Sequence, residues 1–330
     1  MEKRCKHADC SDLPINTVAA HYTHSCVKRH HQYVSVSRVW DSDCYQSSGK
    51  LPQRKVENVA LMQCPVCLKN TWKNRGTQLI ECASCKFVRA KDDYFLANFD
   101  EVYSDKYYQR GDYFNYEEEE KALKKNFTDR LHKISAYVAS GNLLDVGCGY
   151  GYFLELARTR YKAAGVERNH QTAEKVAKRL DLEIFGGDFL EYTGPKKFDI
   201  ITAFDVIEHV LNPKEFVAKC NTLTQTNGLL IIETGDIESV LARVQRDKWR
   251  LINPPEHLNY FSRKTLAALL ASTSYEVLFV QRVPFWRTLR QIVFRSIKRD
   301  AGFISKLPNL LIPLNTYDLI FVGAKKCKSV

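Results

Sequence analysis

Between residues 142 and 234, short apolar runs alternate with longer amphipathic stretches. The apolar runs predict strands at 142–147, 163–167, 183–188, 198–205 and 228–234. The amphipathic stretches between them predict helices at 152–161, 170–180 and 212–223. Strands that alternate with helices form a parallel sheet with helices on both faces. The pattern therefore predicts the α/β class, and it continues with a helix at 262–273 and strands at 275–283 and 318–325.

Two segments precede this repeating pattern. Residues 117–138 have apolar positions at spacings of three and four, at 123, 127, 131, 134 and 138, which predict an amphipathic helix. The stretch 94–116 before it is rich in Tyr and Phe. It is interpreted either as an arm that packs its rings on the main domain or as a lid with hydroxyls facing a substrate. Together they form the predicted segment 94–140.

Residues 286–314 form a basic insertion before the last strand. The sequence 286–299 places Arg and Lys among apolar residues at helical spacing, which predicts a basic amphipathic helix. One interpretation is a helix half-buried on the last two strands with its arginines in solvent. The other is a surface that meets an anionic membrane, a lipid-linked acceptor or a substrate diphosphate.

Residues 1–61 show no persistent helix or strand period. The chain has only two methionines, Met1 and Met62, and organised sequence begins directly after the second. We therefore expect 1–61 to be disordered or to be an upstream extension outside the functional protein. The alternative is a second metal module, built from Cys5, Cys10, His21, His24 and Cys26, although its spacings match no common zinc pattern.

Four cysteines stand in two C-x-x-C pairs. Cys64 and Cys67 precede Cys82 and Cys85, with 14 residues between the pairs. Four thiolates on two tight turns surround one tetrahedral Zn²⁺. A redox pair or unrelated core cysteines are the alternatives. Residues 62–93 are therefore predicted to form a zinc ribbon.

Charge and composition exclude some classes of protein. The net charge of +11 is uneven, since residues 263–330 hold 12 Lys and Arg against 3 Asp and Glu. Only this tail is basic enough to suggest an acidic partner. No apolar run is long enough to span a bilayer, the N-terminus has no signal-like apolar region, and the scattered cysteines favour a reducing compartment. We expect a cytoplasmic protein, peripheral to a membrane if the insertion binds one.

The stretch "LLDVGCGYG" places three glycines after the first predicted strand of the sheet. Gly147, Gly149 and Gly151 follow Asp145 in a D-x-G-x-G-x-G pattern, whereas a dinucleotide loop has its third glycine one place later. An acidic residue beside the loop opposes a pyrophosphate and suits a ligand with a cationic end. S-adenosylmethionine carries a sulfonium and an ammonium group.

From these motifs, residues 143–262 resemble a class I S-adenosylmethionine-dependent methyltransferase. The resemblance rests on "LLDVGCGYG", on "GVE", on "GGDF" and on "FDIITAFDVIEHVLNP", in the family's order and spacing. It implies a Rossmann-like, mostly parallel sheet of seven strands within 141–330, a ribose contact by Glu167 and an adenine contact by Asp188. The full set of cofactor residues that it implies is Asp145, Gly147, Gly149, Gly151, Glu167, Asp188, Phe189, Phe204 and Asp205.

The resemblance extends over residues 62–330. A four-cysteine ribbon, a Tyr-rich arm and "WRLINPPEHLNYFS" are similar to one branch of these enzymes, which includes nucleotide-sugar C-methyltransferases. "IEHV" is also similar to quinone O-methyltransferases. The resemblance therefore implies methyl transfer to oxygen or carbon of a small-molecule acceptor, a sugar nucleotide or a quinone-like ring.

Two histidines are candidates for a general base at the mouth of the sheet. His209 follows the fourth predicted strand, and His257 lies in "PPEH" after the fifth, where Glu256 is a candidate to orient it. His257 is the preferred base, and Glu208–His209 has an alternative role in capping the next helix. A further alternative is an Mg²⁺ site formed by Asp205, Glu208 and His209 with His257 or a substrate diol.

A different class of function is a nucleic-acid-binding module that uses the ribbon and the basic tail. Its methyltransferase core would then modify RNA or serve in binding only. The end of the fourth strand lacks the N/D-P-P-[FY] motif of nucleic-acid amino-methylases, so nucleic acid is the less favoured partner. The sequence does not determine the oligomeric state.

Overall fold

The computed structural model describes residues 63–96, 116–194, 197–297 and 302–327. All of these residues belong to the second of two units into which the chain divides, Val56–Val330. The predicted extension 1–61, the possible second metal module and most of the Tyr-rich arm lie outside the described residues. Within them, no helix is long and apolar enough to cross a bilayer.

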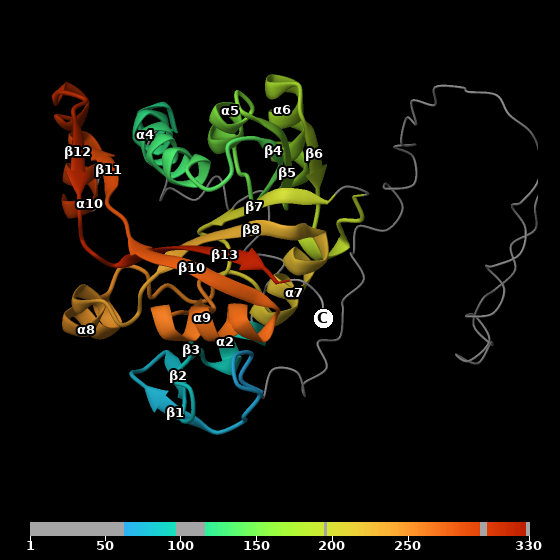
Figure 1. Cartoon of the computed structure of the whole chain (residues 1–330). Helices are drawn as coiled ribbons and strands as arrows, with labels where there is room; N and C mark the ends of the chain where they lie inside the picture. Colours follow the sequence, from blue (N-terminus) through green and yellow to red (C-terminus); the bar gives the residue numbers. More distant parts are fainter. Residues whose placement is uncertain (1–62, 97–115, 195–196, 298–301, 328–330) are drawn as a thin grey trace, which may run out of the picture. The chain divides into compact units, whose positions relative to one another are not determined.

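A seven-stranded sheet forms the centre of the described chain (Figure 1), in the order β10-β13-β8-β7-β4-β5-β6. Its strands are β4 Gly141–Val146, β5 Tyr161–Glu167, β6 Glu183–Gly186, β7 Phe198–Phe204, β8 Thr224–Gly235, β10 Tyr275–Arg282 and β13 Leu319–Lys326. β4 to β8 are mutually parallel, whereas β13 is antiparallel to both β8 and β10. The predicted fold class is thus confirmed: a Rossmann-like, mostly parallel sheet.

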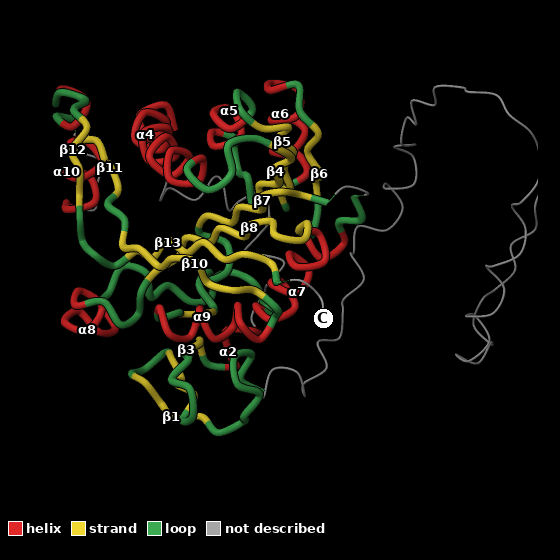
Figure 2. Tube along the Cα trace, viewed as in Figure 1, coloured by secondary structure: helices red, strands yellow, loops and turns green. Residues whose placement is uncertain are grey.

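Helices cover both faces of the sheet, as the colours of Figure 2 show. The helices on the two faces are α4 Tyr116–Ser135, α5 Tyr152–Ala157, α6 His170–Leu180, α7 Pro213–Leu223 and α9 Arg263–Ser272. The short helix α8 Val240–Gln245 follows β8 and packs with Trp249 instead. Neighbouring strand residues point to opposite faces, so Leu143 packs in the cluster that contains α4 to α6, and Leu144 packs with α7 and α9. Burial on both faces explains why these strands are continuous apolar runs in the sequence.

The sheet order creates a switch point between β4 and β7. The chain runs from β4 outward to β5 and β6, then returns to β7 on the other side of β4. In open α/β sheets, ligands bind at the carboxyl ends of the strands at such a point. The glycine loop after β4 and the "DVIEH" loop after β7 both lie there.

The predicted ribbon is not a separate sheet. Its strands β1 Trp72–Arg75, β2 Leu79–Cys82 and β3 Val88–Ala90 are joined by β9 Asn259–Tyr260, in the order β1-β2-β3-β9. The short helix α2 Asp92–Leu96 follows, so the organised segment passes the predicted end at residue 93. β9 comes from the loop after β8, so this small sheet connects the ribbon with the methyltransferase core.

The predicted helix at 286–299 is wrong over its first three residues. Trp286 to Thr288 belong to strand β11 Phe285–Thr288, and the helix α10 begins at Leu289 and ends at Ile297. β11 pairs with β12 Leu311–Leu314, and its Trp286 exchanges hydrogen bonds with Asn126 of α4. Helical spacing and strand alternation are hard to separate over so few residues, and pairing with a distant strand decided the outcome.

Candidate active site

The glycine loop turns sharply after β4 and opens α5. Gly147, with φ +72, lies against the next loop, since a Cβ there would be 2.6 Å from Cγ2 of Val206. Gly149, with φ +50, has no atom within 4 Å of a Cβ position. Gly151, with φ +75, is the N-cap of α5. The loop therefore needs glycine for its backbone, and at Gly149 it leaves open space for a ligand.

Glu167 lies at the end of β5 and is 4% exposed. Its Oε2 accepts a hydrogen bond from the backbone N–H of Gly149 at 2.8 Å, and its Oε1 accepts one from Asn169 at 2.9 Å. The predicted ribose acid is thus beside the open position at Gly149. A carboxylate held at this place suits a diol donor.

Asp145 is buried at the end of β4 and is 3% exposed. Thr202 of β7 donates its hydroxyl hydrogen bond to Oδ1 of Asp145 at 2.6 Å. Burial raises the pKa of Asp145 to about 7, and the nearby charge of Glu167 raises it further. Two buried carboxyl groups beside one open position favour a cationic ligand. The donor set therefore fits S-adenosylmethionine, with its sulfonium, ammonium and ribose groups.

The other predicted cofactor residues surround this place in different ways. Asp188 caps a 3₁₀ turn, Phe189–Glu191, by accepting from the N–H of Leu190 at 2.9 Å. Phe189 is largely buried against Phe216 of α7, with ring centroids 5.2 Å apart. Asp188 therefore holds the turn through one carboxylate oxygen.

Phe204 is the last residue of β7, and Asp205 follows it. The Phe204 ring packs on Phe153 of α5 and on Phe127 of α4, at centroid distances of 4.8 and 5.5 Å. Asp205 has a left-handed backbone, with φ +53, and its N–H donates to the carbonyl of Glu233 at 3.0 Å. The Asp205 residue is exposed.

The two candidate histidines meet. The rings of His209 and His257 are T-shaped, with centroids 4.7 Å apart. Nδ1 of His209 lies 2.8 Å from the carbonyl oxygen of Glu256, and Nδ1 of His257 lies 2.7 Å from that of Leu251. A carbonyl only accepts, so each neutral ring carries its proton on Nδ1 and keeps a lone pair on Nε2.

Both imidazoles are held in the neutral form. Burial lowers the pKa of His209 to about 3, with a further contribution from His257. Burial also lowers the pKa of His257. The Nδ1–H of the preferred base is oriented by the Leu251 carbonyl, whereas Glu256 contributes its carbonyl to His209 and its carboxylate accepts from Asn253 at 2.7 Å.

Glu208, His209 and His257 form a group that is able to hold a metal ion. Their ligand atoms lie within 4.8 Å of one another, and Asp205 is not among them. Glu208 is 5% exposed, and its Oε2 has no hydrogen-bond partner among the described residues. Metal-bound histidines commonly donate their other ring N–H to a backbone carbonyl, as both do here.

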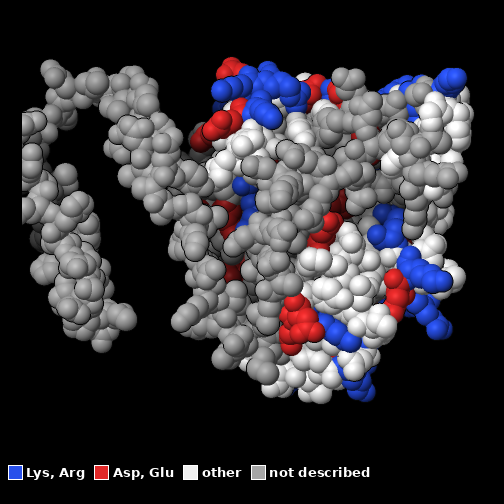
Figure 3. Space-filling model, turned by 180° about the vertical axis from the view of Figure 1, so that it is seen from behind, with Lys and Arg blue, Asp and Glu red and all other residues white. Residues whose placement is uncertain are grey.

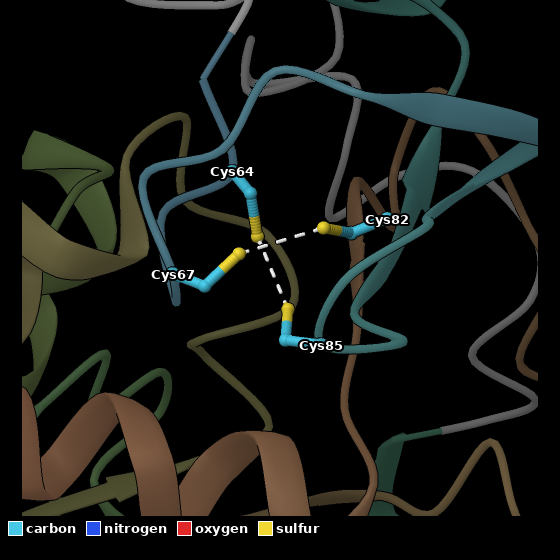
Figure 4. A group of neighbouring side chains, drawn as sticks. All are labelled: Cys64, Cys67, Cys82 and Cys85. Carbon is cyan, nitrogen blue, oxygen red and sulfur yellow. Dashed lines mark hydrogen bonds between the residues drawn. The ribbon is translucent and has the colours of Figure 1, made fainter.

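The four ribbon cysteines converge (Figure 4). Sγ of Cys64 lies 3.4 Å from Sγ of Cys85, and Sγ of Cys67 lies 3.5 Å from Sγ of Cys82. A tetrahedral site with Zn–S bonds of about 2.3 Å separates its sulfurs by about 3.8 Å. The thiols therefore fit a zinc ion with little adjustment.

The ribbon thiols differ in acidity. Burial raises the pKa of Cys64, and burial raises the pKa of Cys85 to about 11. At Cys82 burial also raises the pKa, but hydrogen bonds from the backbone of Cys85 and Ser84 outweigh it and lower the pKa overall. Buried, closely packed thiols are stabilised as thiolates by a cation at their centre.

Sequence reasoning missed two residues that shape the site. Thr202 holds Asp145, and its signal was a polar residue inside the buried run "IITAF". Asn259 is 2% exposed and donates from Nδ2 to the carbonyl of Val210 at 2.6 Å and to that of Ile207 at 3.3 Å. Nothing in the sequence distinguishes this Asn from one in a turn.

Comparisons with known proteins identify a methyltransferase domain in this chain. Residues 116–279 match the family model described as a methyltransferase domain. The ubiquinone biosynthesis O-methyltransferase of Caulobacter sp. (strain K31) is 36% identical over 100 residues, 28% of this chain and 40% of that protein. The mitochondrial one of Schizosaccharomyces pombe is 30% identical over 101 residues, 28% of this chain and 37% of that protein. The chain thus spans less than half the length of these curated relatives.

The solved structures that align with this chain are distant in sequence. Magnesium protoporphyrin IX methyltransferase from Synechocystis PCC 6803, with bound SAH, aligns with a TM-score of 0.46 and 11% identity over 71% of this chain and 97% of that one. An amino pentose methyltransferase from Micromonospora echinaspora aligns with a TM-score of 0.42 and 17% identity over 65% of this chain and 98% of that one.

The family match, the sheet order and the carboxylates around the glycine loop define the class: residues 116–279 form a class I S-adenosylmethionine-dependent methyltransferase domain. The particular features of this chain are the four-cysteine ribbon, joined to the core through β9, and the paired histidines of two different loops.

Proposed function

We propose that this protein transfers a methyl group from S-adenosylmethionine to a hydroxyl oxygen of a small-molecule acceptor. The observation that carries the proposal is the histidine pair at the switch point, where the Leu251 carbonyl binds Nδ1 of His257 and leaves Nε2 as the basic nitrogen of that ring. An O-methyltransferase needs such a base, because a hydroxyl must lose its proton as it attacks.

One group of residues binds the cofactor, and another acts on the acceptor. Asp145 and Glu167 bind the cationic and ribose groups of S-adenosylmethionine, which supplies an electrophilic methyl group on its sulfonium. His257 accepts the acceptor's hydroxyl proton on Nε2, and the Leu251 carbonyl keeps the ring in the correct tautomer. A lowered pKa keeps His257 neutral at pH 7, so it is ready to act as a base.

The acceptor that fits best is an acidic hydroxyl on a quinone-like ring. The relatives that match the core are named as ubiquinone biosynthesis O-methyltransferases, which supports a phenolic acceptor. Carbon of a sugar nucleotide and RNA are the competing acceptors. On the face shown in Figure 3, both acidic and basic side chains of the described residues are visible.

An acceptor screen tests this function. The full chain is incubated with methyl-labelled cofactor and a catechol, a sugar nucleotide or RNA, and the label is located by mass spectrometry. We expect label on a catechol oxygen, and a loss of turnover on the order of 10²–10⁴-fold in His257→Gln with cofactor affinity retained. The exposed His132→Gln is the matched control. Label on a sugar carbon or on RNA would overturn the proposal.

A second candidate is metal-assisted O-methylation. It is favoured by Glu208, whose buried Oε2 has no partner among the described residues and which lies with His209 and His257. A divalent ion held there would lower the pKa of an acceptor diol. Full-length protein that already carries its ribbon metal should then bind one further Mn²⁺, detected by electron paramagnetic resonance, and Glu208→Gln should not. No additional Mn²⁺ in the wild type would exclude this candidate.

We also propose that the ribbon holds one structural Zn²⁺, since four thiols and no other described group converge there. Four-cysteine sites are closed to substrate and contribute to folding.

The insertion 286–314 is further proposed to face an anionic membrane surface. Its exposed apolar side chains are Ile297, Phe303 and Leu310, which are 36%, 50% and 58% exposed. Arg287, Arg290 and Lys306 lie in the same insertion. Arg290 is only partly exposed, because its Nε donates to the carbonyl of Leu307 at 2.6 Å. Exposed apolar groups among cations are typical of a segment that binds the headgroup region of anionic lipids.

A further inference from the structure

The zinc ribbon and the histidine pair are connected through one short strand. β9 is only two residues long, yet it completes the ribbon's sheet: Val88 pairs with Tyr260, and Arg89 pairs with Asn259. The N–H of Ala90 also donates to the carbonyl of Leu258 at 2.9 Å. His257 directly precedes this paired segment.

The other side of the same segment holds the loop after β7. The N–H groups of Leu258 and Asn259 both donate to the carbonyl of Glu208, at 2.8 and 3.0 Å. The Asn259 side chain adds its two bonds, to Ile207 and Val210. Asn259 therefore lies between the ribbon strand, where it is paired with Arg89, and the loop that carries His209, to which it is hydrogen-bonded.

Hydrogen bonds also connect β9 and the loop before it with the two histidines. The hydroxyl of Tyr260 donates to the carbonyl of His257 at 2.9 Å. The ring of His209 is held by the carbonyl of Glu256, which belongs to the other loop. The relative position of the two loops thus decides how the two rings meet.

Packing makes the ribbon a rigid support for this arrangement. Leu79 and Val88 of the ribbon are buried with Trp249 and Tyr260 of the core. The ring of Phe87 packs on Phe261 with centroids 5.2 Å apart. The ribbon is therefore part of the structure that supports the loops and not an appendage.

We propose that Asn259 is a positioning residue through which the four-cysteine ribbon sets the geometry of the His209–His257 pair. This positioning role depends on the proposed function only in the experiments that measure turnover. The chain of contacts runs from the ribbon strand through Asn259 to the loop after β7, and from Tyr260 to His257. Loss of order in the ribbon should then reach both imidazoles.

The test is the imidazole spectrum of Asn259→Asp. Aspartate has the same shape, but as a carboxylate it donates to neither carbonyl, and when protonated it donates to only one. Long-range ¹H–¹⁵N correlation spectra report the tautomer of each histidine, assigned with His209→Gln and His257→Gln. We expect the wild type to show both rings protonated on Nδ1, and the variant to show tautomer mixtures at both.

Turnover gives a second readout. Replacing a residue that orients a catalytic group without touching the substrate typically lowers activity on the order of 10–100-fold. We expect a loss of this size in the kcat of Asn259→Asp, with unchanged cofactor affinity. Thr77→Ala is the matched control, since Thr77 joins the ribbon to Asp247 at 3.2 and 3.3 Å, away from the histidine loops. It should leave the spectra and kcat as in the wild type.

Tyr260→Phe is a milder variant that decides the matter if Asn259→Asp does not fold. It removes the single hydrogen bond to the His257 carbonyl and should shift the His257 signals alone. Withdrawing zinc from the wild type with a chelator should disturb the signals of both histidines. Wild-type histidine spectra in the folded variants, or a chelator effect confined to ribbon amides, would overturn the proposal.

The spectra need no acceptor. A failure to find any methyl acceptor would therefore count against the proposed function alone, and unchanged imidazole spectra would count against the positioning role alone.

Discussion

The two sides of the site are built in different ways. On the cofactor side, Asp145, the glycine loop and Glu167 come from one continuous β4–α5–β5 unit, and backbone N–H groups within it hold the acid in place. On the acceptor side, His209 and His257 come from loops far apart in the chain and are held together by Asn259 and β9. A local motif therefore builds the proposed cofactor site, and long-range packing decides where the proposed base lies.

The largest expected effect comes from a change in the ribbon, which should affect the acceptor side and leave the cofactor side intact. Cys64→Ser should lose the bound zinc, because three thiolates hold the ion poorly and structural zinc supplies folding free energy. Hydrogen exchange should then rise in β1 to β3 and in β9, while β4 and β7 stay protected. Elemental analysis should find one zinc per wild-type chain.

The exposed Cys327→Ser is the control for this change and should keep its zinc. Metal-replete wild-type protein without zinc would contradict the assignment. Equal loss of protection in β4 and β9 would show that the two sides do not differ as proposed.

The next effect concerns the cofactor side alone. Glu167→Ala should weaken S-adenosylmethionine binding by roughly 1.5–3 kcal/mol for each charged hydrogen bond that is lost. Release of the Gly149 and Asn169 N–H groups should add to this loss. Calorimetry gives the affinity, and Glu183→Ala, at the other end of the neighbouring strand β6, is the control.

The imidazole spectra of Glu167→Ala should match those of the wild type, because the hydrogen bonds of Glu167 to Gly149 and Asn169 hold segments other than the histidine loops. Unchanged cofactor affinity in this variant would remove Glu167 from the cofactor site.

A smaller effect is expected at the insertion. Phe303→Ser with Leu310→Ser should reduce binding to anionic vesicles about tenfold, because each burial of an apolar side chain in lipid is lost. The wild type should be released as salt rises, and neutral vesicles should retain little of it. Leu278→Ser, on strand β10, is a control with a similarly exposed leucine.

Co-sedimentation measures this binding. Equal binding of wild type and double variant would leave the insertion with its packing role alone.

The smallest expected effect is the release of a proton from Asp145 when the cofactor binds. With a pKa of about 7, Asp145 is half protonated at pH 7 in the free protein. A cationic ligand lowers that pKa, so binding should release about half a proton per chain. Calorimetry in buffers of different ionisation enthalpy measures the release, and Asp145→Asn should abolish it. Identical release from both proteins would assign the proton to another group.

The same shift has a consequence for stability in the free protein. The pKa of Asp145 is raised on folding, so the protonated form favours the folded state. The stability that Asp145 contributes is complete below its unfolded pKa of about 3.9 and is lost as pH rises through about 7. Bound S-adenosylmethionine should reduce this loss.

The sequence by itself determined the elements whose signals are local. Burial on one or both faces sets the apolar patterns of the strands and helices of the sheet. The backbone angles of a sharp turn require the glycines, and the geometry of a four-thiol site requires the two cysteine pairs. These features depend on neighbours within a few residues or on one repeated unit. For this reason the class of fold was predictable, and so was the position of Glu167 beside the glycine loop.

Tertiary structure alone decided the features that need a distant partner. Pairing with β12 made Trp286 to Thr288 a strand, although their spacing also fits a helix. The carbonyl of Leu251, not the neighbouring Glu256, received the Nδ1–H of His257, because the fold of that loop brings this oxygen to the ring. Asn259 became the link between ribbon and histidines because its short polar side chain is buried where three separate segments meet, and a buried amide must satisfy its hydrogen bonds there.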